Sequence, residues 1–363
     1  MPPIRATVVH VAAVCLALVV AVAPRPPDVV ERWYARGVYP TLQAAVTTAS
    51  NAVPIAVFDV VVVAALAWAL WTWGRAARRA QGRRSLAPLV PALRATLAGL
   101  AGAYLWFVAI WGLNYARPPL DARLGLPTAA ATPAEVAALL DEAVAQANRL
   151  YADSQADDVA FYDADGDVAR GLRVVEARHG RARATVPGRP KPTGLALYFR
   201  VAGVDGLTAP AALETLLNPD LTAAERPFVL AHEWAHLSGY APEADASFVA
   251  WLVTMEPGAK PRTHYSGWLF LLSETAVQVP PEQRRTAVAR LGTGPRRDLD
   301  AIAARARLQV DLVQRVGWRI YDRYLRSQGV REGVVSYSRV VDLIARASRS
   351  ARPRGGAGRP VPQ

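Results

Sequence analysis

Three long apolar runs occupy the first third of the chain. They cover about residues 6–24, 52–73 and 95–113, and the segments between them carry nearly all the charge of this region. An α-helix needs about 20 mostly apolar residues to cross the hydrocarbon core of a bilayer. Each run is long enough, so the pattern predicts a three-helix transmembrane region over residues 1–114.

The first run allows a second interpretation, because Ala21-Val22-Ala23 resembles the cleavage site of a signal peptide. The run is long for such a peptide, and Pro24 would directly follow the cut, so we expect a retained anchor. Asp59 is the only acid inside a predicted span. It is either a functional intramembrane acid or a mark of the outer end of its helix, and we favour the second.

Basic residues in the connecting segments predict the orientation of the chain. The segment 75–94 contains six arginines and no acid, whereas the segment between the first two runs mixes basic and acidic residues. Loops rich in arginine stay in the cytoplasm, so we expect the N-terminus inside and everything after about residue 115 outside. The expected location is the cytoplasmic membrane, crossed several times, with the lipid bilayer as one partner.

The chain after residue 115 has the pattern of a mainly helical domain. The expected helices cover about 132–152, 226–238, 243–255, 264–277, 281–291, 297–327 and 334–346. Leu195–Val201 alternates loosely and predicts a strand. Residues 157–180 are rich in Asp and Gly and predict mostly loop, with a turn at Asp163–Asp167 in place of a calcium loop, because the closing glutamate is missing.

We therefore predict a mainly α membrane protein. Three N-terminal transmembrane helices precede a mostly helical domain with a small β-sheet over residues 115–345, and residues 346–363 form a disordered basic tail. The chain has 42 basic and 30 acidic residues and a net charge of +12, but its basic residues form no stripe with interleaved aromatics. Nucleic acid is therefore not an expected partner. Cys15 is the only cysteine, which excludes a disulfide framework and a cysteine-based metal site.

The strongest chemical signal is the motif His232-Glu233-Trp234-Ala235-His236, which has the form H-E-x-x-H. On a helix, the two histidines lie on one face and can bind one Zn²⁺ ion, and the glutamate acts as a general base toward the zinc-bound water. A possible capping box at Thr222 to Glu225 precedes the motif, and Gly239 follows it, so the segment has its own helix start and stop.

A catalytic zinc ion usually has three protein ligands and one water. The spacing of one metallopeptidase class would place the third ligand at Pro242, which cannot coordinate a metal. Glu243 and Asp245 come next, and both open a new apolar helix. We favour Glu243, with Asp245 as the rival ligand or as a hydrogen-bond acceptor for a ligand histidine.

The predicted reaction is metal-assisted hydrolysis, which also needs a donor for the developing oxyanion. His264 and Tyr265 follow a Pro-Arg-Thr loop and are candidates for this role. A structural role for Tyr265 at the start of a helix is the alternative.

Several blocks of the chain, in order, resemble the bacterial domain-of-unknown-function 3810 family, whose members look like membrane-anchored zinc metallopeptidases. The blocks are Trp111–Tyr115, Arg117–Leu120, Lys191-Pro192, HEWAHLSGYAPEADASFVAWL, Tyr265–Trp268, Tyr324–Gly329 and Ser336-Tyr337. The resemblance implies a three-span anchor and a zincin-like domain. Its pattern E-x-E-A-N-F reads Glu243-Ala-Asp245-Ala-Ser247-Phe248 here, which leaves the third ligand open.

The sequence thus predicts a membrane-anchored, zinc-dependent hydrolase, in particular a metallopeptidase that acts on a peptide or protein. The alternatives are a catalytically silent zinc- or partner-binding protein of the same fold, a transporter component, and a hydrolase of non-peptide amides or lipids. Glu233 argues against the silent protein, and three spans with one marginal acid make a poor conduction path. The sequence does not determine the oligomeric state.

Overall fold

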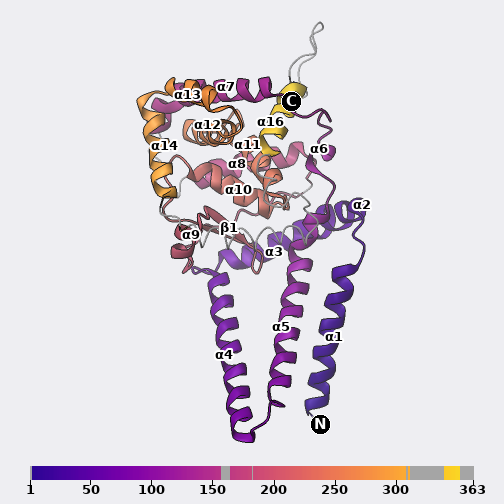
Figure 1. The fold of residues 1–363 in the computed structure, drawn as a ribbon. Coiled ribbons are helices and arrows are strands. Elements are labelled where there is room, and N and C mark those ends of the chain that lie inside the picture. The colour runs from indigo at the N-terminus through magenta and orange to yellow at the C-terminus, as the bar shows by residue number, and fades with distance from the viewer. Residues whose placement is uncertain (1, 157–163, 182, 308–309, 311–338, 352–363) are drawn as a thin grey trace.

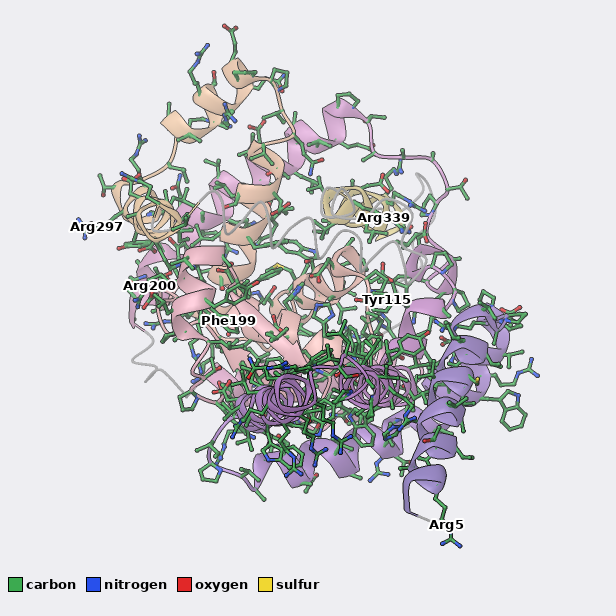
Figure 2. All side chains as sticks on the ribbon, turned by 60° about the horizontal axis from the view of Figure 1, so that its bottom comes forward. Arg5, Tyr115, Phe199, Arg200, Arg297 and Arg339 are labelled. Carbon is green, nitrogen blue, oxygen red and sulfur yellow. The ribbon has the colours of Figure 1, made fainter. Side chains whose placement is uncertain are left out.

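The computed structural model describes residues 2–156, 164–181, 183–307, 310 and 339–351. Three of its helices are long and apolar enough to cross a membrane: α1 (Pro2–Val22), α4 (Val57–Arg83) and α5 (Leu89–Ile110). They lie in one bundle, with the N-terminus and the α4–α5 turn at one end and the other helices at the opposite end (Figure 1). Many large apolar side chains of these helices are exposed and point outward, as bilayer contact requires (Figure 2).

The helix boundaries differ from the prediction at both ends of the arginine-rich segment. Residues 75–94 were expected to form a loop, but α4 continues to Arg83 and α5 begins at Leu89, so only residues 84–88 form the turn. Arginine has a high helix propensity, and nothing stops α4 until Arg84 adopts a left-handed conformation with φ 46°.

A helical segment between α1 and α4 was not predicted. It consists of α2 (Pro27–Val29), the π-helix η1 (Val30–Val38) and α3 (Tyr39–Asn51), and it lies across the ends of the long helices beneath the domain (Figure 1). Tyr39 donates a hydrogen bond to the carbonyl of Leu237 at 2.9 Å, and Thr47 donates one to the carbonyl of Leu213 at 2.9 Å. These buried bonds attach the segment to the domain.

The domain is mostly helical, as expected. Its first helices are α7 (Pro133–Ala156), α8 (Ala164–Arg178) and α9 (Ala196–Ala202), preceded by the short η2 (Gly112–Ala116) and α6 (Leu120–Arg123). The later ones are α10 (Arg226–Leu237), α11 (Glu243–Thr254), α12 (Pro261–Ala276), α13 (Pro281–Ala289), α14 (Thr293–Ala306) and α16 (Arg339–Ala351). Most of the predicted helix 297–327 beyond Ala306 falls outside the described residues.

Three predictions for this domain are wrong. Ala164–Arg178 was expected to be loop but forms α8, and the expected strand Leu195–Val201 is the helix α9, which ends at Gly203 with φ 70°. Residues 346–363 were expected to form a disordered tail, but α16 continues to Ala351, and Arg346 is buried beside Asp121 at 3.1 Å; the rest of the predicted tail, 352–363, lies outside the described residues. Buried ion pairs and apolar faces that meet only in the folded chain outweigh local composition here.

The small sheet consists of two antiparallel strands, β1 (Gly206–Ala209) and β2 (Glu214–Leu217). Lys191 forms an isolated bridge with Leu216 on the other side of β2. Asp59 lies in the first turn of α4 and accepts hydrogen bonds from Thr193 (2.8 Å) and from the Gly194 N–H (2.6 Å). The acid therefore marks the domain end of its helix.

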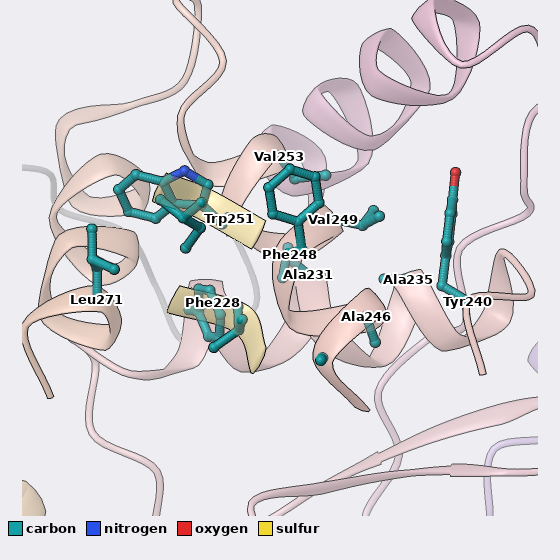
Figure 3. Close-up of a cluster of buried hydrophobic side chains, with 14 of the residues drawn as sticks. Phe228, Ala231, Ala235, Tyr240, Ala246, Phe248, Val249, Trp251, Val253 and Leu271 are labelled. Atoms are coloured by element: carbon teal, nitrogen blue, oxygen red, sulfur yellow. The ribbon is translucent and has the colours of Figure 1, made fainter. Parts of the chain in front are cut away.

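The core is centred on α10 and α11, which pack closely together. Phe228, Ala231 and Ala235 of α10 face Phe248 and Val249 of α11 (Figure 3). The small alanine side chains at the contact allow the two helices to lie close together, so side chains of α10 contact side chains of α11. This close packing brings the start of α11 next to the histidine motif on α10.

A buried ion pair connects the sheet to α4. The Lys191 ammonium lies 2.8 Å from the Glu214 carboxylate, and both side chains are almost fully buried. The same carboxylate accepts hydrogen bonds from the backbone N–H groups of Val57 and Phe58, at the N-terminus of α4. The Lys191 ammonium and the N-terminus of α4 therefore offset the cost of burying the Glu214 carboxylate.

We expect Lys191→Met to lower the stability of the protein by about 3–5 kcal/mol, because it leaves the Glu214 carboxylate buried without its cation. Thermal unfolding of the purified protein in detergent measures the effect. The only other lysine, Lys260, is exposed, so Lys260→Met is the matched control. An equal unfolding temperature for both variants would contradict the assigned role of the pair.

Candidate metal centre

The helix that carries the motif begins and ends as its sequence predicts. The N–H of Thr222 donates to the Glu225 carboxylate at 3.0 Å, and the N–H of Glu225 donates to the Thr222 hydroxyl at 3.3 Å. This reciprocal pair is the predicted capping box. Gly239 follows the end of the helix and has a φ of 81°, in the left-handed region. A Cβ atom at this position would lie 2.7 Å from the Asn114 amide oxygen, so only glycine fits.

Three side chains converge on one point. The Nε2 atoms of His232 and His236 lie 3.1 Å apart, and Glu243 Oε2 lies 3.1 Å from the first and 3.5 Å from the second. A tetrahedral zinc ion with bonds of about 2.0–2.2 Å holds its ligand atoms about 3.3–3.6 Å apart. The observed spacing and the donor set of two imidazoles and one carboxylate therefore fit a zinc-sized cation.

Hydrogen bonds fix the orientation of both imidazole rings. His236 Nδ1 lies 2.8 Å from the backbone carbonyl of Tyr240, so it donates there and leaves Nε2 free to face Glu243. His232 Nδ1 lies 3.2 Å from the Ser247 hydroxyl on α11. The sequence did not predict either contact. Each one holds the Nδ1 atom of its ring and so sets the direction in which the Nε2 atom points.

The electrostatics of the cluster follow from its burial and its opposite charges. Burial opposes the charged form of Glu243, yet His236 and His232 hold its pKa well below the usual value. Burial likewise opposes the charged form of His236, but the Glu243 carboxylate raises its pKa to about 9. The pocket thus provides a charged carboxylate ligand.

Glu233 is buried beside the cluster and is held by the sheet. The Thr208 hydroxyl on β1 donates to Glu233 Oε2 at 2.9 Å and is 2.8 Å from the Glu233 backbone oxygen. A Cβ at Gly206 would lie only 2.5 Å from Glu233 Oε1, so the carboxylate occupies the space that glycine leaves. Burial raises the pKa of Glu233, although the neighbouring histidines oppose this effect.

A cavity of about 1040 Å³ lies next to these residues. His232, His236, Glu243 and Glu233 line it together with residues 205–208 at the start of β1. Its remaining walls are largely apolar. They include side chains from the α4 start, the α5 end and α9, namely Phe58, Trp111, Tyr115, Leu195, Tyr198 and Phe199.

The end of α5 also touches α10 directly. The Trp111 indole N–H donates to the carbonyl of His236 at 3.2 Å, and the two rings meet edge to face. Asn114, three residues further, packs against Gly239. This contact explains why the block Trp111–Tyr115 sits at the junction of the apolar bundle and the domain.

Two residues predicted for the site take other roles. Asp245 is buried, but its partner is Arg123 at 3.7 Å, and it binds neither histidine. Tyr265 is also buried, donates to Asp298 at 2.7 Å, and is not among the residues that line the cavity; His264 does not line it either. The oxyanion role predicted for Tyr265 or His264 is therefore not supported.

The architecture and the site define a helical membrane protein with a candidate metal centre. The sequence model of the family described as Protein of unknown function (DUF3810) matches residues 34–345, so the chain belongs to this family. No curated protein and no solved structure matches the chain.

Proposed function

We propose that the protein is a membrane-anchored zinc metallopeptidase. The observation that carries this proposal is the convergence of His232, His236 and Glu243 from two packed helices, with the buried Glu233 beside them in the wall of the same cavity. A structural metal site has no need of a second carboxylate that is not a ligand, or of a cavity for a substrate.

Each residue has a role in this proposal. His232, His236 and Glu243 hold the zinc ion, which when bound polarises a carbonyl and lowers the pKa of a water. Glu233 accepts the proton of the attacking water and returns it to the leaving amine. Thr208 fixes the Glu233 carboxylate, and burial raises the pKa of Glu233, which favours uptake of a proton.

A peptide suits the cavity because β1 forms part of its wall. Among the described strands, β1 pairs only with β2, so no described strand covers its other edge. An extended peptide can pair with such an edge, which aligns a scissile bond along the strand. The segment Leu195–Val201, which was expected to be a strand, forms a helix, so β1 is the strand considered in this proposal.

The cavity lies close to the proposed membrane surface. Phe58 in the first turn of α4 and Trp111 at the end of α5 both line it. On α9, Leu197 is 66% exposed and Tyr198 is 45% exposed, which is typical of side chains that enter an interface. We therefore propose a site that acts on chains held at, or close to, the bilayer.

We further propose three spans, with the N-terminus and the arginine-rich turn in the cytoplasm and the domain outside. In a Cys15→Ser background, Thr128→Cys in the domain and Ser85→Cys in the turn are both at exposed positions. A membrane-impermeant thiol reagent on intact cells should label the first and spare the second. Labelling of only the second would reverse the orientation.

The experiment that tests the proposed function combines metal analysis with a cleavage assay. We expect the purified full-length protein to contain about one zinc per chain, as a single three-ligand site requires. It should cleave an unfolded protein substrate such as casein, lose this activity to a chelator and regain it with zinc. A protein that cannot be loaded with zinc would overturn the proposal.

A further inference from the structure

The wall of the cavity has an uneven distribution of charge. Five of its described residues are acids: Asp205, Glu225, Glu233, Glu243 and Glu274. None of the described lining residues is a lysine or an arginine, although the chain has a net charge of +12. The cavity is therefore acidic inside a basic protein.

Four of the five acids have partners within the fold. Arg305 of α14 lies 2.8 Å from Asp205 and also pairs with Glu225, so one cation neutralises two acids at the wall. Glu233 accepts the hydrogen bond of Thr208, and Glu243 contacts the two histidines of the motif. These contacts account for the acids around the site, with one exception.

Glu274 has no hydrogen-bond or ion-pair partner among the described residues. It lies on α12 one turn after Phe270, both residues line the cavity, and its side chain is half-buried. The Phe270 ring stacks on Phe228 with 3.7 Å between the ring centroids, so this part of the wall is apolar. Burial raises the pKa of Glu274, and no cation among the described residues opposes the shift.

A carboxylate in such surroundings is costly without a cation, and a charged group on a ligand removes that cost. We propose that Glu274 determines specificity by binding the ammonium or guanidinium group of a basic side chain, so the preferred substrate is a peptide segment with a lysine or arginine among apolar residues. This inference rests on the proposed peptidase function. The charge of Glu274 and the apolar walls of the cavity define this class of substrate.

The test measures binding separately from cleavage. The full-length Glu233→Gln variant is loaded with zinc in detergent, and dissociation constants are measured for hexapeptides of alanine and phenylalanine. Each position in turn carries lysine, norleucine or glutamate. Norleucine keeps the alkyl chain of lysine and removes the ammonium group, so the comparison isolates the charge.

At one position or more, we expect lysine to bind about tenfold more tightly than norleucine, the size of one charge-assisted contact, and glutamate to bind most weakly. Adding Glu274→Gln should reduce the lysine-to-norleucine ratio to about one, and Glu274→Asp should restore part of it. The zinc content and circular dichroism of each variant verify that it is folded.

Equal affinities for lysine and norleucine at every position would overturn the inference. It would also fail if the preference survived Glu274→Gln or if no peptide bound. A lysine preference that depends on Glu274, in a protein whose wild type cleaves no peptide, would support the binding role of Glu274 and contradict the peptidase function. The two proposals can thus fail independently.

Discussion

Glu233→Gln should reduce peptide hydrolysis by about 10²–10⁴-fold, the usual contribution of a general base. The amide has nearly the same shape as the carboxylate and can still accept the hydrogen bond of Thr208, but it cannot take a proton from water. The zinc content should stay at the wild-type value, because Glu233 is not among the three converging ligand atoms.

The assay compares initial cleavage rates of the two proteins at equal zinc content. Glu142→Gln is the matched control, since Glu142 is an exposed glutamate on α7 and does not line the cavity. This control should cleave at the wild-type rate. Wild-type activity in Glu233→Gln would show that another group accepts the proton, and the role assigned to Glu233 would be wrong.

His236→Ala and Glu243→Ala should each abolish stable zinc binding. Each substitution leaves two protein ligands where a catalytic zinc site needs three, so the loss of affinity should exceed the about 10–100-fold typical of losing a supporting contact. Metal analysis after gel filtration should therefore give close to no zinc for either variant. Both variants should also be inactive.

Asp245→Asn is the informative control for the third ligand. Asp245 lies two residues from Glu243 and is equally buried, but it faces Arg123. Burial raises the pKa of Asp245 to about 6, although Arg123 opposes this effect, so a neutral asparagine is tolerated at moderate cost. We expect Asp245→Asn to retain zinc. If Asp245→Asn lost zinc and Glu243→Ala kept it, the third ligand would be Asp245 and not Glu243.

Local sequence predicted the helices on which the candidate site lies, because their signals lie within a few residues of each other. The capping box at Thr222 to Glu225 forms as predicted, and a second one forms at Thr132 to Glu135, where a helix was expected to begin. The spacing of His232 and His236 places both on one helix face, whatever the rest of the fold does. The three long apolar helices follow from length and hydropathy in the same way.

Short apolar segments were the main source of error. The run Leu195–Val201 fits a strand and a helix about equally well by periodicity. Its helical form depends on Gly203, which supplies a left-handed residue at its end, and on the packing of Phe199 against Ala209 and Leu216 of the sheet. The strand that does line the cavity, β1, is only four residues long and has no clear alternation.

The sequence by itself predicted the three long apolar helices, the helix of the H-E-x-x-H motif and two of the three side chains that converge there, because each depends on neighbours along the chain. That Glu243, and not Asp245, joins the two histidines was decided only by the tertiary structure. Residues two apart on a helix face different directions, and the packing of α11 against α10 turns one toward the histidines and the other toward Arg123. The sequence also did not predict that Thr208 donates a hydrogen bond to Glu233, or that Glu274 lines the cavity. Each of these depends on contacts between segments that are far apart in the chain.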